Sequence, residues 1–173
     1  RITVTDSLVE YQEKWGVWVT GQGTSLTAGG LSSDHNQLGV MVDKAAFADI
    51  RDSLFENNQA GGMVVRNPGT ESKVYNVRCD RNQATGMVIL DEANAEIIHS
   101  TARENATAGL AFQNNASGSV QLCLLESNIT CGLFVSGEKT NVMLEQIQCL
   151  ANQRDGIDVV DSAAAVILDS ICR

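Results

Sequence analysis

Apolar and polar residues alternate along this chain in short stretches that recur every 23 or 24 residues. A glycine opens one stretch in each repeat, and apolar side chains stand one and three positions after it, as in Gly86-Met87-Val88-Ile89. The repeat glycines are Gly16, Gly39, Gly62, Gly86, Gly109, Gly132 and Gly156. Alternation with a period of two is typical of a β-strand with one buried face. A constant period of this length predicts a solenoid, in which each repeat forms one coil of a stack.

Two more apolar pairs in each repeat predict two more strands. One pair stands nine and seven residues before the glycine, as Val77 and Cys79 do, and the other stands fourteen and twelve residues before it, as Ala95 and Ile97 do. Three short strands per coil, each with alternate side chains inside, describe an all-β fold. We therefore predict a right-handed parallel β-helix solenoid of about seven coils of 23–24 residues, forming a single domain over residues 1–173.

Two other repeat folds fit less well. A leucine-rich repeat has a similar period, but the segment after its asparagine is a helix or an irregular arc, whereas here it is a second strand pattern. A left-handed β-helix of hexapeptides needs coil lengths near multiples of its unit, and the observed period does not supply them. The pattern also begins and ends within a repeat, which predicts that the chain is a segment of a longer β-helix.

An asparagine stands four residues before the repeat glycine in five successive coils. These residues are Asn58, Asn82, Asn105, Asn128 and Asn152. Asparagine tolerates the left-handed turn conformation, and stacked side-chain amides can bond to one another along the rod. We expect a structural asparagine ladder that ends upstream, where His35 and Gln12 occupy the same count from the glycine.

The position two residues after the repeat glycine is predicted to face solvent, yet it is apolar in six successive coils. This apolar stripe consists of Trp18, Met41, Val64, Val88, Ala111 and Phe134. At one coil spacing per step it is roughly 24 Å long. Four leucines, Leu8, Leu31, Leu54 and Leu124, are also predicted to point outward from another strand. Exposed apolar patches mark contacts, so we expect a covering segment, self-association or a docked partner on the stripe.

The stretch Asn82-Gln83-Ala84-Thr85-Gly86-Met87-Val88-Ile89 resembles the right-handed parallel β-helix repeat of the pectate-lyase-like superfamily. The resemblance covers essentially the whole chain and implies the fold predicted above. It also implies a range of functions, because that superfamily includes polysaccharide lyases, glycoside hydrolases, uronan epimerases, phage tailspikes and non-catalytic surface proteins. The motif is therefore specific for the fold and says little about the chemistry.

Charge and cysteine content narrow the choice of partners. The net charge of −9 opposes binding to nucleic acid, and the apolar runs are too short to span a membrane. Cys79, Cys149 and Cys172 share one core position of the repeat, so we interpret them as small apolar side chains. Cys149 and Cys172 would lie on adjacent coils, where a disulfide could form. The absence of a CxxC pair gives no support for a zinc site, and no metal site is predicted.

The best candidate catalytic residues are Arg154, Asp155 and Asp158, which lie in the last complete coil. Paired carboxylates can supply the acid and the base of glycoside hydrolysis. The stretch around Asp155 looks like the Asn-x-Asp-Gly of polygalacturonases with one residue inserted, but the other motifs of that family do not occur in this chain. The two histidines, His35 and His99, stand nearly three coils apart and are too distant to cooperate.

Acidic residues also recur at one loop edge, together with a single lysine. They are Asp43, Asp91, Glu92, Glu138, Lys139 and Asp161. A calcium site needs several oxygens at one point, and these residues are spread over several coils. We interpret them as a solvated acidic rim. No cofactor is predicted, and calcium is the one cation that these carboxylates could bind.

The leading hypothesis is a non-catalytic β-helix scaffold or binding module at a cell surface or outside the cell, with the apolar stripe covered by a partner or by another segment. The alternative is a polysaccharide-acting enzyme, a lyase, epimerase or hydrolase acting on acidic glycans. The enzyme requires Asp155 or Asp158 beside a basic residue in an open groove. The expected partners are an acidic polysaccharide or a second copy of the chain, and neither nucleic acid nor a membrane span is expected.

Overall fold

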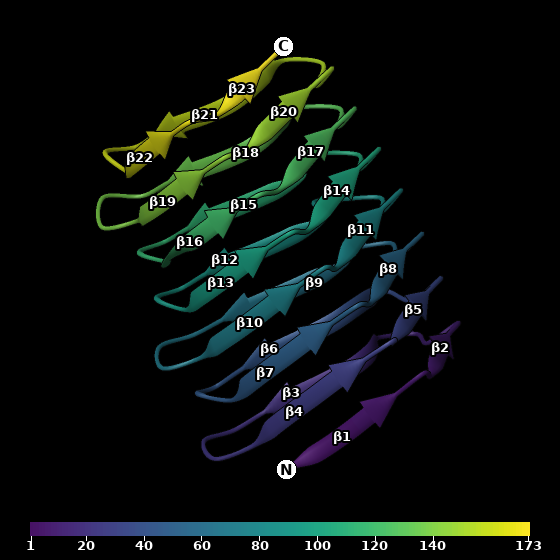
Figure 1. Cartoon of the computed structure of the whole chain (residues 1–173). Coiled ribbons are helices and arrows are strands. Elements are labelled where there is room, and N and C mark those ends of the chain that lie inside the picture. The colour runs from purple at the N-terminus through teal and green to yellow at the C-terminus, as the bar shows by residue number, and fades with distance from the viewer.

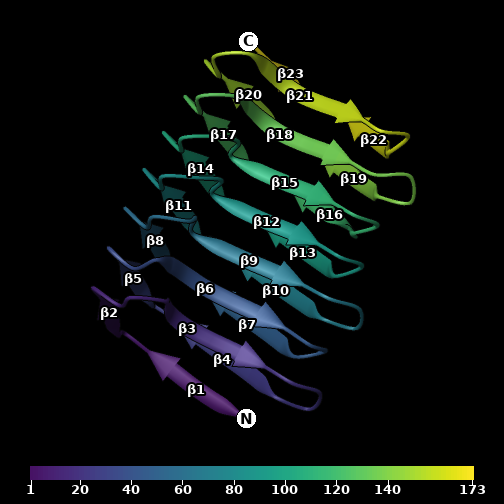
Figure 2. The same cartoon turned by 180° about the vertical axis from the view of Figure 1, so that it is seen from behind.

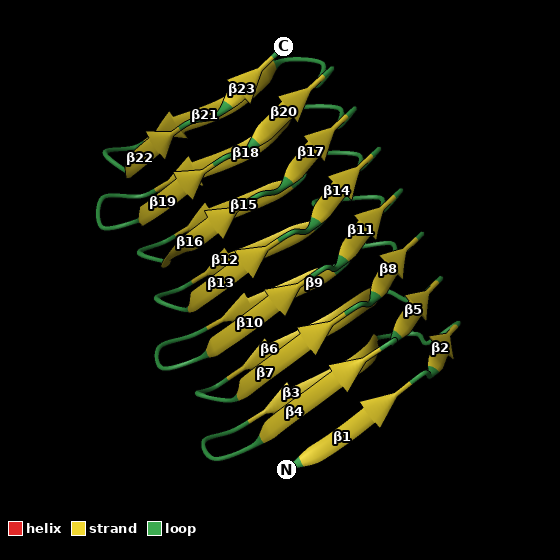
Figure 3. Cartoon of the chain, in the orientation of Figure 1, coloured by secondary structure: helices red, strands yellow, loops and turns green.

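The computed structural model describes residues 1–173, and it contains strands and turns but no helix (Figure 3). Its 23 strands stack into three parallel sheets that run along one rod, so each coil contributes one strand to each sheet (Figure 1). Residues with alternating polarity at three places in each repeat thus form three strands per coil. The predicted parallel β-helix is confirmed.

We name the sheets A, B and C in the order in which the chain visits them. Sheet A consists of β1 (Ile2–Thr5), β4 (Ser25–Gly29), β7 (Phe47–Arg51), β10 (Glu71–Tyr75), β13 (Asn94–Ile98), β16 (Ser117–Gln121), β19 (Asn141–Glu145) and β22 (Ala164–Leu168). Sheet B consists of β2 (Leu8–Glu10), β5 (Ser32–Asp34), β8 (Leu54–Glu56), β11 (Arg78–Asp80), β14 (Thr101–Arg103), β17 (Leu124–Glu126), β20 (Gln148–Leu150) and β23 (Ile171–Cys172). Sheet C consists of β3 (Trp15–Thr20), β6 (Leu38–Asp43), β9 (Met63–Arg66), β12 (Met87–Leu90), β15 (Leu110–Gln113), β18 (Cys131–Ser136) and β21 (Asp155–Val160).

One apolar core of 33 buried residues runs inside the rod. The inward pairs predicted from the sequence, such as Val77 and Cys79 on one side and Ala95 and Ile97 on another, are fully buried. Gly118 leaves room in the core for the ring of Phe112, because a Cβ on Gly118 would lie 2.9 Å from Cε1 of that ring. Because interiors are close-packed, such pairs of large and small side chains keep the core filled.

The repeat glycines are required by close approach rather than by an unusual backbone angle. A Cβ on Gly86 would lie 2.6 Å from the carbonyl oxygen of Gly109 and 2.9 Å from Nδ2 of Asn105. The neighbouring coil and the asparagine ladder therefore leave room only for hydrogen at this position. This contact explains why glycine and asparagine recur together in the sequence.

The asparagine ladder is present, and it is buried except at Asn152, which is partly exposed. In a typical step, Nδ2 of Asn105 donates to Oδ1 of Asn128 at 3.0 Å and to the carbonyl oxygen of Cys79 at 2.9 Å. Oδ1 of Asn105 accepts from the backbone nitrogen and from Nδ2 of Asn82, at 3.1 and 3.0 Å. Each step thus gives a buried backbone N–H of the turn, here that of Asn82, an acceptor on the next coil.

Two details of the predicted ladder were wrong. It extends one coil further upstream, because the backbone nitrogen of Asn36 donates to Oδ1 of Asn58 at 2.9 Å. In this coil the ladder asparagine stands three residues before the repeat glycine, Gly39, instead of four. Counting four residues back from Gly39 therefore reached His35 instead of Asn36. The left-handed conformation also belongs to the residue before each ladder asparagine, such as Arg81 with φ 54° and His35 with φ 53°.

The same shorter turn explains why one leucine was wrongly predicted to point outward. Leu31 is 1% exposed and belongs to the core. Ser32 instead stands opposite Leu8 and Leu54 in the outward column of sheet B. The prediction for Leu31 was therefore wrong by one position.

All five cysteines are free thiols. Cys149 and Cys172 lie in register on β20 and β23, as expected for adjacent coils, but no disulfide joins them. Burial raises the pKa of the Cys123 thiol to about 11, which keeps it protonated and unreactive. No helix in the structure has the length and apolar character needed to cross a membrane.

Candidate functional site

The apolar stripe lies on the outer face of sheet C, which is the near side in Figure 2. Strand register places its members directly opposite one another from β3 to β18, and Asp158 of β21 continues the column. The stripe residues are absent from the central core cluster, so their side chains belong to the outside of the coil. A single row of outward side chains thus runs parallel to the rod axis.

Exposure varies along this row. Trp18 is 47% exposed, and Val64, Val88 and Phe134 are partly exposed. Met41 is only 6% exposed and Ala111 only 3%, so the expectation that the whole stripe faces solvent was wrong for these two residues. The stripe therefore has an exposed indole at one end, a partly exposed phenyl ring at the other, and a floor of apolar side chains between them.

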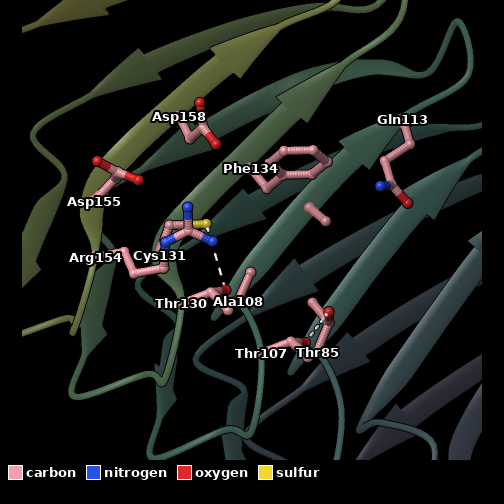
Figure 4. A pocket seen from close by; sticks show the side chains of 11 residues that line it. Thr85, Thr107, Ala108, Gln113, Thr130, Cys131, Phe134, Arg154, Asp155 and Asp158 are labelled. Atoms are coloured by element: carbon pink, nitrogen blue, oxygen red, sulfur yellow. Dashed lines mark hydrogen bonds between the residues drawn. The ribbon is translucent and has the colours of Figure 1, made fainter.

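A hollow of about 340 Å³ lies at the phenyl end of the stripe (Figure 4). Its lining combines Phe134 of β18 with Arg154, Asp155 and Asp158, which belong to β21 or to the turn before it. The structure thus brings all three candidate catalytic residues into one concave site together with one end of the stripe. Asp158 occupies the stripe position of the next coil, so its place beside Phe134 follows from the repeat, and the hollow adds Arg154 and Asp155 to this pair.

Hydroxyl and amide groups line the other side of the hollow. They come from Thr85, Thr107, Thr130 and Gln113. The hydroxyls of Thr85 and Thr107 are 2.6 Å apart and share a hydrogen bond. Sequence reasoning missed these residues, although each threonine stands one or two positions before a repeat glycine. Thr107, Thr130 and Arg154 stand two positions before three successive repeat glycines, and this short polar row was the signal available in the sequence.

The thiol of Cys131 also lines the hollow, where Oγ1 of Thr130 donates to its sulfur at 3.8 Å. Burial raises the pKa of Cys131, and the nearby carboxylates of Asp158 and Asp155 raise it further. The thiolate is the nucleophilic form of cysteine, so this environment disfavours nucleophilic chemistry at Cys131. We interpret it as an apolar part of the wall.

Arg154 forms no ion pair within the chain, although two carboxylates line the same hollow. Its guanidinium can therefore donate hydrogen bonds to a bound molecule. Asp155 and Asp158 supply acceptors, and Phe134 supplies an apolar face. The arrangement suits a ligand that has both an apolar face and many hydroxyl groups.

One member of the predicted acidic rim is buried instead of solvated. Asp43 is 1% exposed and accepts hydrogen bonds from Nε1 of Trp18 at 3.2 Å and from Nη2 of Arg66 at 3.3 Å, so it is not a solvated rim residue. Asp91 accepts from Asn114, and Asp161 from Ser136, each on a neighbouring coil. No group of three or more His, Cys, Asp or Glu side chains is placed to hold a metal ion.

The two histidines occupy separate turns. Nδ1 of His35 lies 2.8 Å from Oδ1 of Asp34, and its ring stacks on Tyr11 with the centroids 5.2 Å apart. The ring of His99 meets Tyr75 edge-on, with the centroids 5.5 Å apart. Neither histidine lines the hollow on sheet C.

Sheet A carries ion pairs that the sequence analysis did not identify. Arg51 donates to Asp49 at 2.9 Å, and Nζ of Lys73 lies 3.7 Å from Glu96. The side chains of Arg51, Lys73 and Glu96 are exposed and that of Asp49 is partly exposed, and surface pairs of this kind contribute about 0–1 kcal/mol to stability. We interpret them as a solvated face of the rod.

One family model and two solved structures resemble this chain. The model of a family described as "Right handed beta helix region" matches residues 38–173, and no curated protein matches the sequence. The structure is similar to the periplasmic alginate epimerase AlgG, with a TM-score of 0.65 and 12% identity over 98% of this chain and 46% of that one. It is also similar to the pectate lyase Pel9A, with a TM-score of 0.62 and 16% identity over 96% of this chain and 55% of that one.

These likenesses concern the backbone fold, because the identities are low, and the chain spans about half the length of each of these proteins. The family model covers most of the chain and agrees with the three parallel sheets and the repeat pattern. The chain belongs to the right-handed β-helix family.

Proposed function

We propose that this β-helix is a binding module that holds a polysaccharide chain against the outer face of sheet C, without chemistry of its own. One observation carries the proposal: the hollow combines the ring of Phe134 with the unpaired guanidinium of Arg154, two carboxylates and three threonines. A pyranose ring has apolar C–H faces and a rim of hydroxyl groups. Aromatic faces pack on the first, and polar side chains bond to the second.

The similar structures support a polysaccharide as the ligand class. Both are named for action on a polysaccharide, one as an alginate epimerase and the other as a pectate lyase. They support the proposal through the fold alone, since function resides in sites and not in folds. One of them is named as periplasmic, and we propose that this protein likewise acts outside the cytoplasm, at a cell surface or in the surrounding medium.

The proposal is tested by affinity electrophoresis in gels that contain one polysaccharide each, from an acidic series (alginate, polygalacturonate) and a neutral series (glucans, mannans, xylans). We expect retardation by at least one of them. Phe134→Ala and Arg154→Ala should each weaken the interaction about tenfold, which corresponds to about 1.4 kcal/mol. The matched control is Tyr75→Ala, which removes a 43% exposed ring from sheet A and should change nothing. Equal retardation of all four proteins would contradict the proposal.

Catalysis at the same hollow is the second candidate function. The observation in its favour is that Arg154, Asp155 and Asp158 line one concave site. Paired carboxylates can act as acid and base, and a cationic group can neutralise a uronate. Incubation with alginate or polygalacturonate, with and without added calcium, should give neither unsaturated products nor new reducing ends if the protein only binds. Product that disappears in Asp155→Asn or Asp158→Asn would replace the binding module with an enzyme.

A second copy of the chain, or a covering segment, is the competing occupant of the stripe. The paired substitution Val64→Glu plus Val88→Glu changes two partly exposed stripe residues and leaves the buried Met41 in place. Self-association through sheet C would appear in sedimentation velocity as a dimer that this variant dissolves. A monomer for both proteins is the result that fits an open, glycan-binding face.

A further inference from the structure

The stripe has a second aromatic end, on β3, far from the hollow. Trp15 and Trp18 pack against each other there with ring centroids 4.3 Å apart and planes tilted by 48°. Trp18 remains 47% exposed. A half-exposed indole contributes much less to stability than a buried one. Core packing therefore does not explain why a tryptophan stands at this position.

The indole of Trp18 is held in place by a buried carboxylate. Asp43 on β6 accepts from Nε1 of Trp18 at 3.2 Å and from Nη2 of Arg66 at 3.3 Å. Burial alone would raise the pKa of Asp43, but hydrogen bonds from Thr20, Trp18 and Arg66 outweigh it, and the pKa lies below its usual value. The carboxylate is therefore ionised and fixes both the ring and the guanidinium. A preorganised ring loses little freedom when a ligand binds.

The two ends of the stripe share three kinds of side chain. Each combines an aromatic ring with an arginine and at least one aspartate, namely Trp18 with Arg66 and Asp43, and Phe134 with the residues of the hollow. Five strand spacings separate Trp18 from Phe134, roughly 24 Å along the rod. Val64, Val88 and Ala111 form an uncharged floor between them. An extended polymer could lie on this floor and touch both ends.

The charges on this face do not favour a polyanion. The Trp18 end carries one carboxylate and one guanidinium, and the Phe134 end carries two carboxylates and one guanidinium. The two ends together therefore carry three carboxylates and two guanidiniums, on a chain with a net charge of −9. Like charges on two partners oppose association, whereas an uncharged, hydroxyl-rich chain meets no such barrier.

We propose that Trp15, Trp18 and Arg66 form a second sugar-binding subsite, and that a neutral glycan lies along sheet C and occupies this subsite and the Phe134 hollow together. This inference rests on the proposed binding function and specifies its ligand class and length. Two linked contacts bind more tightly than either alone, because the second becomes intramolecular once the first has formed. Affinity should therefore rise steeply when the oligosaccharide becomes long enough to reach both ends.

The chain offers a direct probe, because Trp15 and Trp18 are its only two tryptophans. Their fluorescence, and its quenching by acrylamide, therefore reports on the second subsite alone. Titration with cello-, manno- and xylo-oligosaccharides of increasing length should protect the tryptophans from quenching for the long members of at least one series. Short members that bind only in the Phe134 hollow should leave quenching unchanged. This measurement needs no substitution and does not depend on how a variant folds.

Calorimetric titration of variants provides the second arm. Trp18→Ala should lower affinity for long oligosaccharides tenfold or more and leave that for short ones unchanged, whereas Phe134→Ala should weaken both. Tyr75→Ala is the control for loss of an exposed ring, and unchanged thermal unfolding of each variant verifies its fold.

Long neutral chains that bind no better than short ones, without protecting the tryptophans, would overturn the second subsite but leave the Phe134 hollow intact. Oligogalacturonate that protects the tryptophans at lower concentration than any neutral series would overturn the neutral ligand class. A failure of every glycan to bind, at any length or charge, would overturn the binding function itself and this inference with it.

Discussion

The asparagine ladder gives the sharpest test of how this fold is stabilised. We consider Asn105→Ala, at the centre of the ladder. Oδ1 of Asn105 accepts two hydrogen bonds from Asn82, one from the backbone nitrogen and one from Nδ2. Its own Nδ2 donates to Asn128 and to the carbonyl oxygen of Cys79. Alanine removes all four bonds from a site that is 0% exposed.

The magnitude follows from the donors that lose their acceptor. The backbone N–H of Asn82 and one hydrogen of its side-chain amide are left without a partner in a buried turn. Each orphaned buried donor costs about 1–3 kcal/mol, so the variant should lose about 2–6 kcal/mol of unfolding free energy. Whole domains have about 5–15 kcal/mol of stability, so this loss is a large fraction of the total.

Chemical denaturation measures this loss, and amide hydrogen exchange locates it. The Asn105→Ala midpoint should fall well below that of the unmodified protein, and the Asn82 amide should exchange faster. The matched control is Asn141→Ala, which changes an exposed asparagine on β19 whose side chain forms no hydrogen bond and should shift stability by no more than about 0.5 kcal/mol. A loss below about 1 kcal/mol for Asn105→Ala, close to that of the control, would refute the role assigned to the ladder.

Three further predictions concern packing, pH and thiols. Gly86→Ala should destabilise the protein by more than about 1 kcal/mol in denaturation, because its Cβ would lie 2.6 Å from a carbonyl oxygen, whereas Gly29→Ala meets nothing within 4 Å and should be tolerated. Asp43 has a lowered folded pKa, so its contribution is complete above the ordinary aspartate pKa of about 3.9 and is lost as the pH falls through the lower folded value. Acid titration of stability and tryptophan fluorescence should show this loss, and Asp43→Asn should abolish it. Among the thiols, the exposed Cys172 should react first with an alkylating reagent in native protein, and the fully buried Cys79 should react only on unfolding, as peptide mass analysis can check.

The sequence was sufficient to predict the fold because every coil repeats the same chemical requirements. The glycine column predicted the coil period, the three apolar pairs in each repeat predicted three sheets, and inward pairs such as Val77 and Cys79 are buried as expected. Counting from the glycine failed where one turn is a residue shorter, and it therefore missed Asn36 and misplaced Leu31. A period shows that a coil is complete, but it does not show where within the coil a residue has been gained or lost.

The candidate site was predictable only in part. Arg154, Asp155 and Asp158 are close in the chain, so their proximity followed from the sequence, but the hollow also needs Phe134 and threonines from three other coils. Asp43 and Arg66 stand in the same outward column one coil apart, yet the burial of Asp43 depends on side-chain conformations that a column alignment does not contain. The repeat thus predicts which strand and face a residue occupies, whereas its burial and hydrogen bonds depend on contacts with side chains from other coils.

Mapping the bound glycan onto the backbone tests the central claim most directly. Backbone amide NMR resonances would be followed during titration with the polysaccharide that is retained in affinity gels. The account predicts shifts on sheet C, concentrated on β12, β15, β18 and β21 around the Phe134 hollow and, for a polymer that also reaches Trp18, on β3, β6 and β9. The resonances of sheets A and B should be unchanged. Shifts centred on sheet A or sheet B, or no shifts at saturating glycan, would contradict the assignment of sheet C as the binding face.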